Sequence, residues 1–268
     1  MNIYRHLRLS VLILLFIQGH NVLSQQSVLT QHNDLNRTGW NDKESILNTK
    51  NVNRNSFGKI FSRSVDDQIY AQPLVVSGVN IPGQGTRNIV IVATVNNTVY
   101  AFDADSAAVI NPYWQTNLTP SGSRVIKNKD MTGACDGYYE DFSGNMGIVG
   151  TPVIDSQTNT MYLVSRSVTT GADSSFQQYL HALNIETGRE RPNSPVLITA
   201  QISGTGYDNE GGIITFNSQT QNQRAGLLLL KGIVYITWSS HCVVALFSAL
   251  KIFAIVNARS KAPTIICL

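Results

Sequence analysis

Carboxylate side chains gather in two stretches that turn-forming residues place in loops, and these are the first candidates for chemistry. They are Asp136, Glu140 and Asp141 in one stretch and Asp208 and Glu210 in the other, where Asn209 adds an amide. Such oxygen atoms could hold a calcium ion or act as general bases. The plainer interpretation, which we favour, is that these side chains are solvated.

Two further groups combine a histidine with residues that could bind or react. His32, Asp34 and Arg37 lie close together in a polar lead-in, where we expect them to satisfy backbone groups of a long loop. The run 239–241 places two serines directly before a histidine, but a sequential serine–histidine pair is not a catalytic triad. No G-x-S-x-G, H-E-x-x-H or phosphate-binding loop motif occurs. The sequence therefore assigns no catalytic residue.

The cysteines are Cys135, Cys242 and Cys267, and an odd number leaves one thiol over in a secreted chain. We expect Cys135 to pair with Cys242, because Cys267 lies in a C-terminal tail that departs from the rest of the chain. The alternative is three unpaired thiols. No C-x-x-C motif occurs, so no metal site is predicted.

Residues 1–24 have the pattern of a secretory signal peptide. Arg5 and Arg8 precede an apolar run over 9–17, and a polar pair, Gln25 and Gln26, follows the expected cleavage point. The alternative is an uncleaved anchor, but a membrane-spanning helix needs about 20 apolar residues. We therefore expect a secreted protein, extracellular or periplasmic, with no stable membrane span.

Three sequons, at Asn36, Asn96 and Asn117, gain meaning if the chain is secreted. They accept a glycan only in a host that glycosylates secreted proteins. The pair Asn96 and Asn97 predicts a tight hairpin turn. We therefore expect Asn96 to be the most accessible of the three.

Composition favours many short strands joined by turns. Of 268 residues, 43% are hydrophobic, 14% are charged and 20 residues are glycine. The formal net charge of +3 overstates the basic character, because five of the 20 basic residues lie in the leader or the C-terminal tail, leaving 15 against 17 acidic ones. No binding of nucleic acid is predicted.

Two eight-residue stretches repeat the same order of residue types. VYAFDADS (99–106) and LHALNIET (180–187) each run from an apolar strand into an acidic or amide turn, with Asp103 aligned on Asn184 at an offset of 81 residues. A repeat at fixed spacing marks units that bury their faces by stacking on neighbours.

The strands that must hold these turns are predicted from apolar runs and turn residues. A strand is expected over 57–65. The first unit then has strands over 70–76, 88–94, 98–102 and 113–117, the second over 150–155, 161–166 and 178–185, and the third over 225–230 and 233–238. Polar surface loops are expected over 79–87, 119–146, 168–177 and 192–223.

This order predicts an all-β fold over residues 25–242, a partial β-propeller of four-stranded antiparallel blades. About two and a half blades are expected, of a ring that needs about 4–8 to close. The alternative is a β-sandwich, which does not require the strand order to recur. Residues 243–268 match no part of the repeat and are expected to be an aberrant or truncated tail. An open arc of blades exposes unpaired edges and should be marginally stable.

Corners of the form FxLDxxTGxxxW after an apolar strand are typical of quinoprotein-type β-propellers. Here they stand over 101–106 with Trp114, and over 182–188. With the stretches 31–61, 70–76, 147–155 and 221–242, the chain resembles secreted, largely uncharacterised propeller proteins with PQQ-like repeats. The resemblance covers about residues 31–242 and implies the fold, but it lends no firm biochemical role.

Two functions remain open. The first is a secreted, non-catalytic binding or scaffold protein with a protein or glycan ligand. The alternative is a fragment of a quinone-dependent dehydrogenase, in which PQQ and calcium would act with a carboxylate base. Quinoprotein alcohol dehydrogenases also carry a vicinal cysteine pair over the cofactor, and no Cys-Cys occurs here. We therefore expect the first function.

Overall fold

A computed structural model of the chain describes residues 26–131, 139, 140, 142, 144–206 and 209–241, and the backbone of two strands over 253–257 and 265–267. In these residues the helical structure is one 3-10 turn, η1 (Asn128–Met131), and strands dominate. The predicted all-β fold is confirmed. The signal peptide predicted over 1–24 lies outside the described residues. None of the described helical structure is long and apolar enough to cross a membrane.

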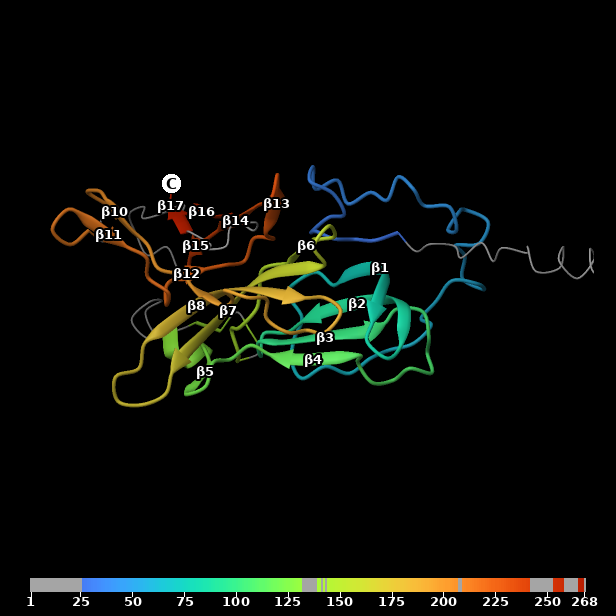
Figure 1. Ribbon diagram of the computed structural model, residues 1–268, viewed down its shortest axis with the longest axis horizontal. Helices are drawn as coiled ribbons and strands as arrows, with labels where there is room; N and C mark the ends of the chain where they lie inside the picture. Colours follow the sequence, from blue (N-terminus) through green and yellow to red (C-terminus); the bar gives the residue numbers. More distant parts are fainter. Residues whose placement is uncertain are drawn as a thin grey trace, which may run out of the picture.

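The first sheet is a four-stranded antiparallel meander whose strands pair in chain order (Figure 1). They are β1 (Leu74–Ile81), β2 (Gly85–Ala93), β3 (Thr98–Asp103) and β4 (Trp114–Asn117). Asn97 has a left-handed backbone, φ 57°, in the tight turn between β2 and β3, as the Asn96–Asn97 pair predicts. β1 and β2 extend into the predicted loop over 79–87, because Gly83 and Gly85, both at φ 73°, permit a tight turn there.

The second sheet has five strands, and all of its pairs are antiparallel. They are β5 (Ser123–Val125), β6 (Val153–Asp155), β7 (Thr160–Thr169), β8 (Phe176–Asn184) and β9 (Val196–Leu197). β6 pairs with the beginning of β7 and β5 with its end, so the two short strands share the position that β1 fills in the first sheet. β7 and β8 also run into the predicted loop over 168–177, which is shorter than expected.

A third four-stranded antiparallel sheet follows. Its strands are β13 (Leu228–Leu230), β14 (Ile233–Thr237), β16 (Phe253–Asn257) and β17 (Ile265–Cys267). β16 and β17 come from the tail that the sequence sets apart, yet they take the third and fourth positions of this sheet. Their β-branched residues suit that pairing. The third sheet is therefore more complete than the expected half blade.

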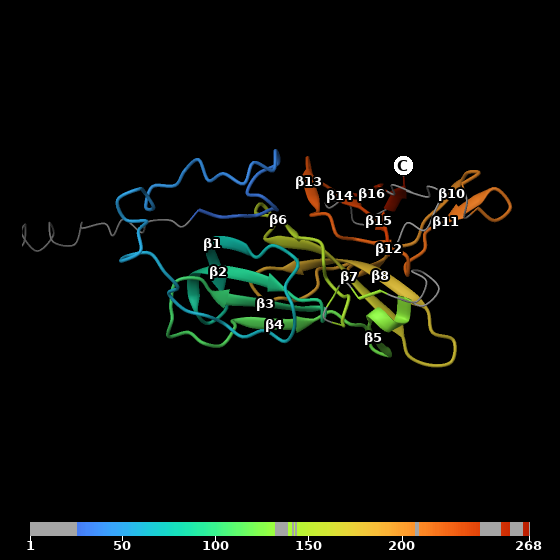
Figure 2. The ribbon, with the colours of Figure 1, turned by 180° about the vertical axis from the view of Figure 1, so that it is seen from behind.

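Two short antiparallel ribbons lie outside these sheets. β10 (Gln201–Ser203) pairs with β11 (Ile213–Thr215), and β12 (Gln221–Asn222) pairs with β15 (Ser239–Ser240). The β10–β11 ribbon stands at one end of the long axis of the molecule, and the N-terminal segment, drawn in blue, lies at the other (Figures 1 and 2). The predicted loop over 192–223 therefore carries structure of its own.

The predicted strand over 57–65 is wrong. The structure shows no strand in that segment. Phe57 is 56% exposed and Ile60 is 84% exposed. A strand is stabilised by pairing and by burying one face; this segment pairs with no strand, and its alternate residues over 61–65 are only half-buried.

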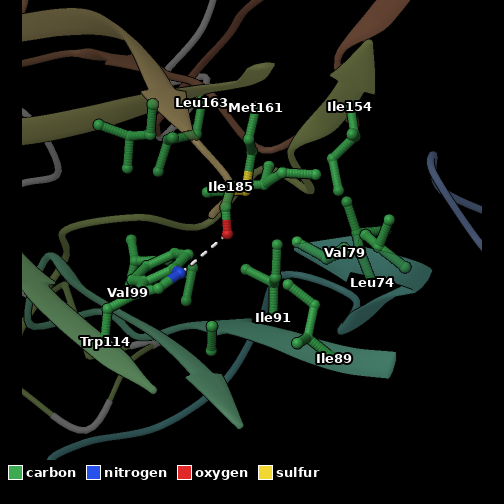
Figure 3. Close-up of a cluster of buried hydrophobic side chains, with 14 of the residues drawn as sticks. Leu74, Val79, Ile89, Ile91, Val99, Trp114, Ile154, Met161, Leu163 and Ile185 are labelled. Atoms are coloured by element: carbon green, nitrogen blue, oxygen red, sulfur yellow. Dashed lines mark hydrogen bonds between the residues drawn. The ribbon is translucent and has the colours of Figure 1, made fainter. Parts of the chain in front are cut away.

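A cluster of buried aliphatic side chains joins the first and second sheets (Figure 3). Met161 and Leu163 of β7 and Ile154 of β6 belong to the same cluster as Ile89 and Ile91 of β2, and each is at most 3% exposed. Burying one such side chain contributes about 1.5–3 kcal/mol. This shared cluster therefore stabilises both sheets.

Alternate residues of the second sheet belong to a different cluster. Tyr162 and Val164 of β7 are grouped with Val234 and Ile236 of β14 and with Trp238. Because successive residues of a strand point to opposite faces, the second sheet is buried against the first sheet on one side and the third on the other. The predicted first and second units are thus adjacent antiparallel sheets.

The two repeated corners, the turns that begin at Asp103 and Asn184, are closed by the same kind of hydrogen bond in the first two sheets. Asp103, at the end of β3, accepts hydrogen bonds from the backbone amides of Asp105 at 2.8 Å and Ser106 at 2.6 Å. Asn184, at the end of β8, accepts one from the amide of Glu186 at 2.7 Å. Each side chain closes the turn after the third strand of its sheet, which explains the choice of Asp or Asn.

We expect Asp103→Ala to lower the free energy of unfolding by about 2 kcal/mol and Asp103→Asn by less than half as much. The carboxylate also accepts a hydrogen bond from the Tyr113 hydroxyl, so alanine removes the partner of three donors. Asparagine keeps the oxygen that serves in the second corner. Urea denaturation followed by tryptophan fluorescence measures both losses. Equal losses would contradict the equivalence of the corners.

Trp114 joins the first sheet to the corner of the second. Its indole N–H donates a hydrogen bond to the carbonyl oxygen of Ile185 at 2.8 Å (Figure 3). Gly188 has φ 69°, and a Cβ there would lie 2.4 Å from Cε3 of Trp114. The tryptophan after the first corner and the glycine in the second corner therefore form one contact between successive sheets.

Candidate functional site

The polar N-terminal segment over 26–48, called the lead-in, contacts the first and second sheets and the residue just before the third. Val28 pairs with Val75 of β1, and the carbonyl oxygen of Leu29 accepts a hydrogen bond from the amide of Ile154 at 2.9 Å. Further along, Arg37 donates to the carbonyl oxygen of Leu227, just before β13, at 3.0 Å. This segment therefore ties the sheets together.

Asp34 and Arg37 satisfy backbone groups, as predicted, whereas the contact of His32 is made by its own backbone amide. Arg37 donates to the carbonyl oxygen of Gln31 at 2.7 Å, and Asp34 accepts from the amide of Thr38 at 3.2 Å. The amide of His32 donates to the side chain of Gln72 at 3.0 Å. Their contacts are those of a structural segment.

A serine, a histidine and a glutamate form a linear hydrogen-bonded relay in the second sheet. Oγ of Ser165 lies 2.7 Å from Nε2 of His181, and Nδ1 of His181 lies 2.6 Å from Oε1 of Glu190. Ser165 is on β7 and His181 on β8, while Glu190 follows the corner after β8. This is the order of partners found in serine nucleophile sites, in which a carboxylate orients the imidazole.

The serine and the histidine of the relay are buried inside the stack of sheets, whereas the side chain of Glu190 is 29% exposed. Ser165 is 0% exposed and His181 is 2% exposed. Leu163 pairs with His181 across β7 and β8, so both lie on the face that packs against the first sheet. A nucleophile must reach its substrate, and this hydroxyl has no exposed surface. The relay is therefore suited to satisfying buried polar groups.

We expect Ser165→Ala to destabilise the protein by about 1–3 kcal/mol, because Nε2 of His181 would lose its partner in a buried site. The matched control is Ser175→Ala, which removes an exposed hydroxyl from the turn between β7 and β8. Thermal and urea unfolding compare the two variants. A Ser165→Ala protein as stable as the control would show that the relay contributes nothing to the core.

A buried cation lies on the opposite face of β7. Arg166 is 1% exposed, and Nη1 lies 3.0 Å from Nε2 of His241. Nη2 donates to the carbonyl oxygen of Gln219 at 3.1 Å, and the ring of Tyr139 meets that of His241 edge-on, with centroids 4.8 Å apart. Because a guanidinium only donates hydrogen bonds, Nε2 of His241 accepts, and the imidazole is neutral.

Burial and charge change the pKa values of this pair. Burial lowers the pKa of Arg166 to about 10, although Tyr139 raises it in part, so the side chain stays protonated at neutral pH. Burial and, in second place, the charge of Arg166 lower the pKa of His241 to about 3. The group is therefore a fixed positive charge beside a neutral histidine.

The remaining predicted residues do not gather into a site. Among the described residues, Glu140 and Glu210 are exposed, and no three histidine, cysteine, aspartate or glutamate side chains lie together as metal ligands. Asp136, Asp141 and Asp208 lie outside the described residues. The two serines before His241 form β15, and His241 instead contacts Arg166.

The disulfide predicted between Cys135 and Cys242 lies outside the described residues, as does the side chain of Cys267. Tyr139, four positions after Cys135, contacts His241, which directly precedes Cys242. The two cysteines therefore adjoin segments that meet, and their pairing stays a prediction.

The sequons differ in accessibility from what the sequence predicts. Asn36 and Asn117 are exposed, whereas Asn96 is half-buried and donates a hydrogen bond to Oδ2 of Asp66 at 2.8 Å. The expectation that Asn96 is the most accessible is wrong, because its turn packs against Asp66. Asn117 donates to the carbonyl oxygen of Asn96 at 2.9 Å, so Asn36 has the most open setting.

An open hollow of about 1160 Å³ lies beside the β10–β11 ribbon. Its wall is formed by the ribbon, the turn over 216–219 and Phe176 at the start of β8. Ile198 and Phe216, both buried, also line it. The hollow is thus formed where the β10–β11 ribbon and its flanking turn meet the start of β8.

Sequence reasoning missed the relay, and it singled out His241 without its partner Arg166. Ser165, His181 and Glu190 are separated by 16 and 9 positions and carry no linear motif. A serine and a histidine on neighbouring strands can be paired only once the register is known, because a shift of one residue moves a side chain to the other face. Polar residues inside the strands of an apolar repeat are the signal that could have indicated them.

No protein-family model matches the chain, and no curated protein matches it.

Proposed function

We propose that the protein is a secreted, non-catalytic binding or scaffold protein whose stacked sheets are the blades of a partial β-propeller. Three successive antiparallel sheets, of which the second is buried on both faces, support this architecture. The resemblance of its corners to PQQ-like repeats supports it as well. Secretion is proposed from the N-terminal pattern of the sequence.

The observation that carries the proposal is the contrast between the buried serine and histidine of the relay and the open hollow. Ser165 and His181 have the geometry of a nucleophile and its base, but both are buried. The hollow beside β10–β11 is open to solvent and is lined mainly by neutral polar side chains and apolar groups. Such a surface can hold a ligand but offers no aligned groups for bond breaking.

Covalent labelling tests the absence of catalysis at the relay. The full chain is incubated with a fluorophosphonate probe, which modifies activated serines, and the product is analysed by mass spectrometry. We expect no labelling at Ser165. Labelling there that disappears in Ser165→Ala would show that the hydroxyl is reached and activated, and would overturn the proposal.

The alternative, a quinone-dependent dehydrogenase, would need oxygen ligands for calcium beside the cofactor. In the part of the chain that the structure describes, the carboxylates do not gather into such a set, so the residues do not fit these groups. Dye reduction by the full chain supplied with PQQ, calcium and an alcohol or aldose would favour the alternative.

A further inference from the structure

The hollow beside the β10–β11 ribbon is lined mostly by uncharged side chains that can form hydrogen bonds. Apart from the carboxylate of Glu210, its polar side chains are amides and hydroxyls: Gln201, Asn209, Asn217 and Gln219, and Thr199, Thr215 and Ser218. Gln201 and Thr215 are opposite each other in the ribbon, and Nε2 of Gln201 lies 3.4 Å from Oγ1 of Thr215. They therefore present a donor and acceptor pair on one face of the ribbon.

The charge of the lining excludes several ligand classes. Glu210 is the ionisable side chain among the described residues that line the hollow, and they include no lysine, arginine or histidine. Phosphates and nucleic acids are bound through cationic side chains. The hollow therefore favours a ligand that is neutral and rich in hydrogen-bonding groups.

The apolar part of the lining suits the same ligand. Among the lining residues, Phe176 is half-buried, and Ile198 and Phe216 are buried. A pyranose ring has one face of C–H groups, which packs on an aromatic ring, and an equator of hydroxyls, which pair with amides. At about 1160 Å³ the hollow is above the usual range of small-molecule sites, so it has room for several sugar units.

We infer that this hollow binds a segment of a neutral carbohydrate chain. The inference rests on the proposed binding function and names its ligand class. Gln201 and Thr215 bond to ring hydroxyls, and Phe176 packs against the C–H face. The site is built by the ribbon, its flanking turn and Phe176 at the start of β8, and none of the residues of the two repeated corners lines it.

Isothermal titration of the full chain tests this with cellohexaose, laminarihexaose, maltohexaose and chitohexaose, and with a heparin hexasaccharide as the anionic counterpart. We expect one neutral hexasaccharide to bind and the heparin fragment not to bind. The double variant Gln201→Ala, Thr215→Val should weaken that binding at least tenfold. Both side chains tested are on the exposed ribbon, so circular dichroism should show an unchanged fold.

The matched control is Ile202→Thr, which lies between these positions in sequence but points to the other face of β10 and does not line the hollow. It should bind as the unmodified chain does. If the double variant does not fold, Thr199→Val takes its place. Binding that is unchanged in the lining variant, preferred binding of heparin, or no binding of any neutral hexasaccharide would each overturn the inference. The last result would leave a protein ligand, and the proposed function, intact.

Discussion

Gly188→Ala should destabilise the protein by about 3 kcal/mol or more, one of the two largest effects that we expect. Gly188 has φ 69°, a backbone conformation that costs other residues about 1–2 kcal/mol. Its Cβ would also lie 2.4 Å from Cε3 and 2.7 Å from Cδ2 of Trp114. Because Trp114 is held by its hydrogen bond to Ile185, the ring cannot move without losing that bond. Overpacking of this kind adds about 1–3 kcal/mol.

The matched control is Gly83→Ala, at φ 73° in the turn between β1 and β2, where a Cβ meets nothing within 4 Å. This variant has the backbone strain without the steric collision, and it should lower the free energy of unfolding by about 1 kcal/mol. Urea unfolding of the two variants separates strain from collision. If both variants lose the same stability, the tryptophan does not pack on the glycine, and the proposed link between successive sheets fails.

Local signals in the sequence predicted the hairpins and corners. The Asn96–Asn97 turn, the strand predicted over 98–102 and found over 98–103, and the acidic or amide turns at Asp103 and Asn184 depend on residues within a few positions of each other. The repeat then indicated which strands are equivalent. Local hydrogen bonding and strand periodicity are therefore the parts of this fold that a single sequence reveals.

Non-local pairing produced the differences. β5 lies in a predicted loop but pairs with the end of β7, and β16 completes the third sheet from a segment without the repeat. The pattern over 57–65 is that of a strand, yet no partner takes it. Whether a segment forms a strand depends on a neighbouring strand that its own sequence does not specify. For this reason the structure of these three segments differs from the prediction.

The candidate site was predicted less well, because its groups come from distant segments. The sequence singled out His241 for the serines before it, but its partner is Arg166, 75 positions away. The buried polar residues of β7 alternate between two faces, Ser165 toward one and Arg166 toward the other. Only the register of β7 and β8 tells which side of the sheet each one serves.

His241 should make the protein lose stability on acidification. Its pKa is about 3 in the folded protein, against an ordinary value of 6.5. Between these values the unfolded chain binds a proton at this histidine that the folded chain does not. The stability that follows from the lowered pKa of His241 is therefore complete above pH 6.5 and declines as pH falls toward 3. The loss relative to neutral pH should be about 2 kcal/mol at pH 5 and about 3 kcal/mol at pH 4.

His241→Gln isolates this contribution, because the amide oxygen can still accept from Arg166 but does not titrate. Asp66, Asp103 and Asp130, whose pKa values are lowered by hydrogen bonds that outweigh burial, add their own acid sensitivity, and both proteins share it. The free energy of unfolding in urea, measured from pH 7 to pH 4, should therefore fall less steeply in the variant. His32→Gln, which removes an exposed histidine, should follow the unmodified protein. Parallel profiles for all three proteins would mean that His241 takes up its proton without opening the fold, and that the buried guanidinium does not control it.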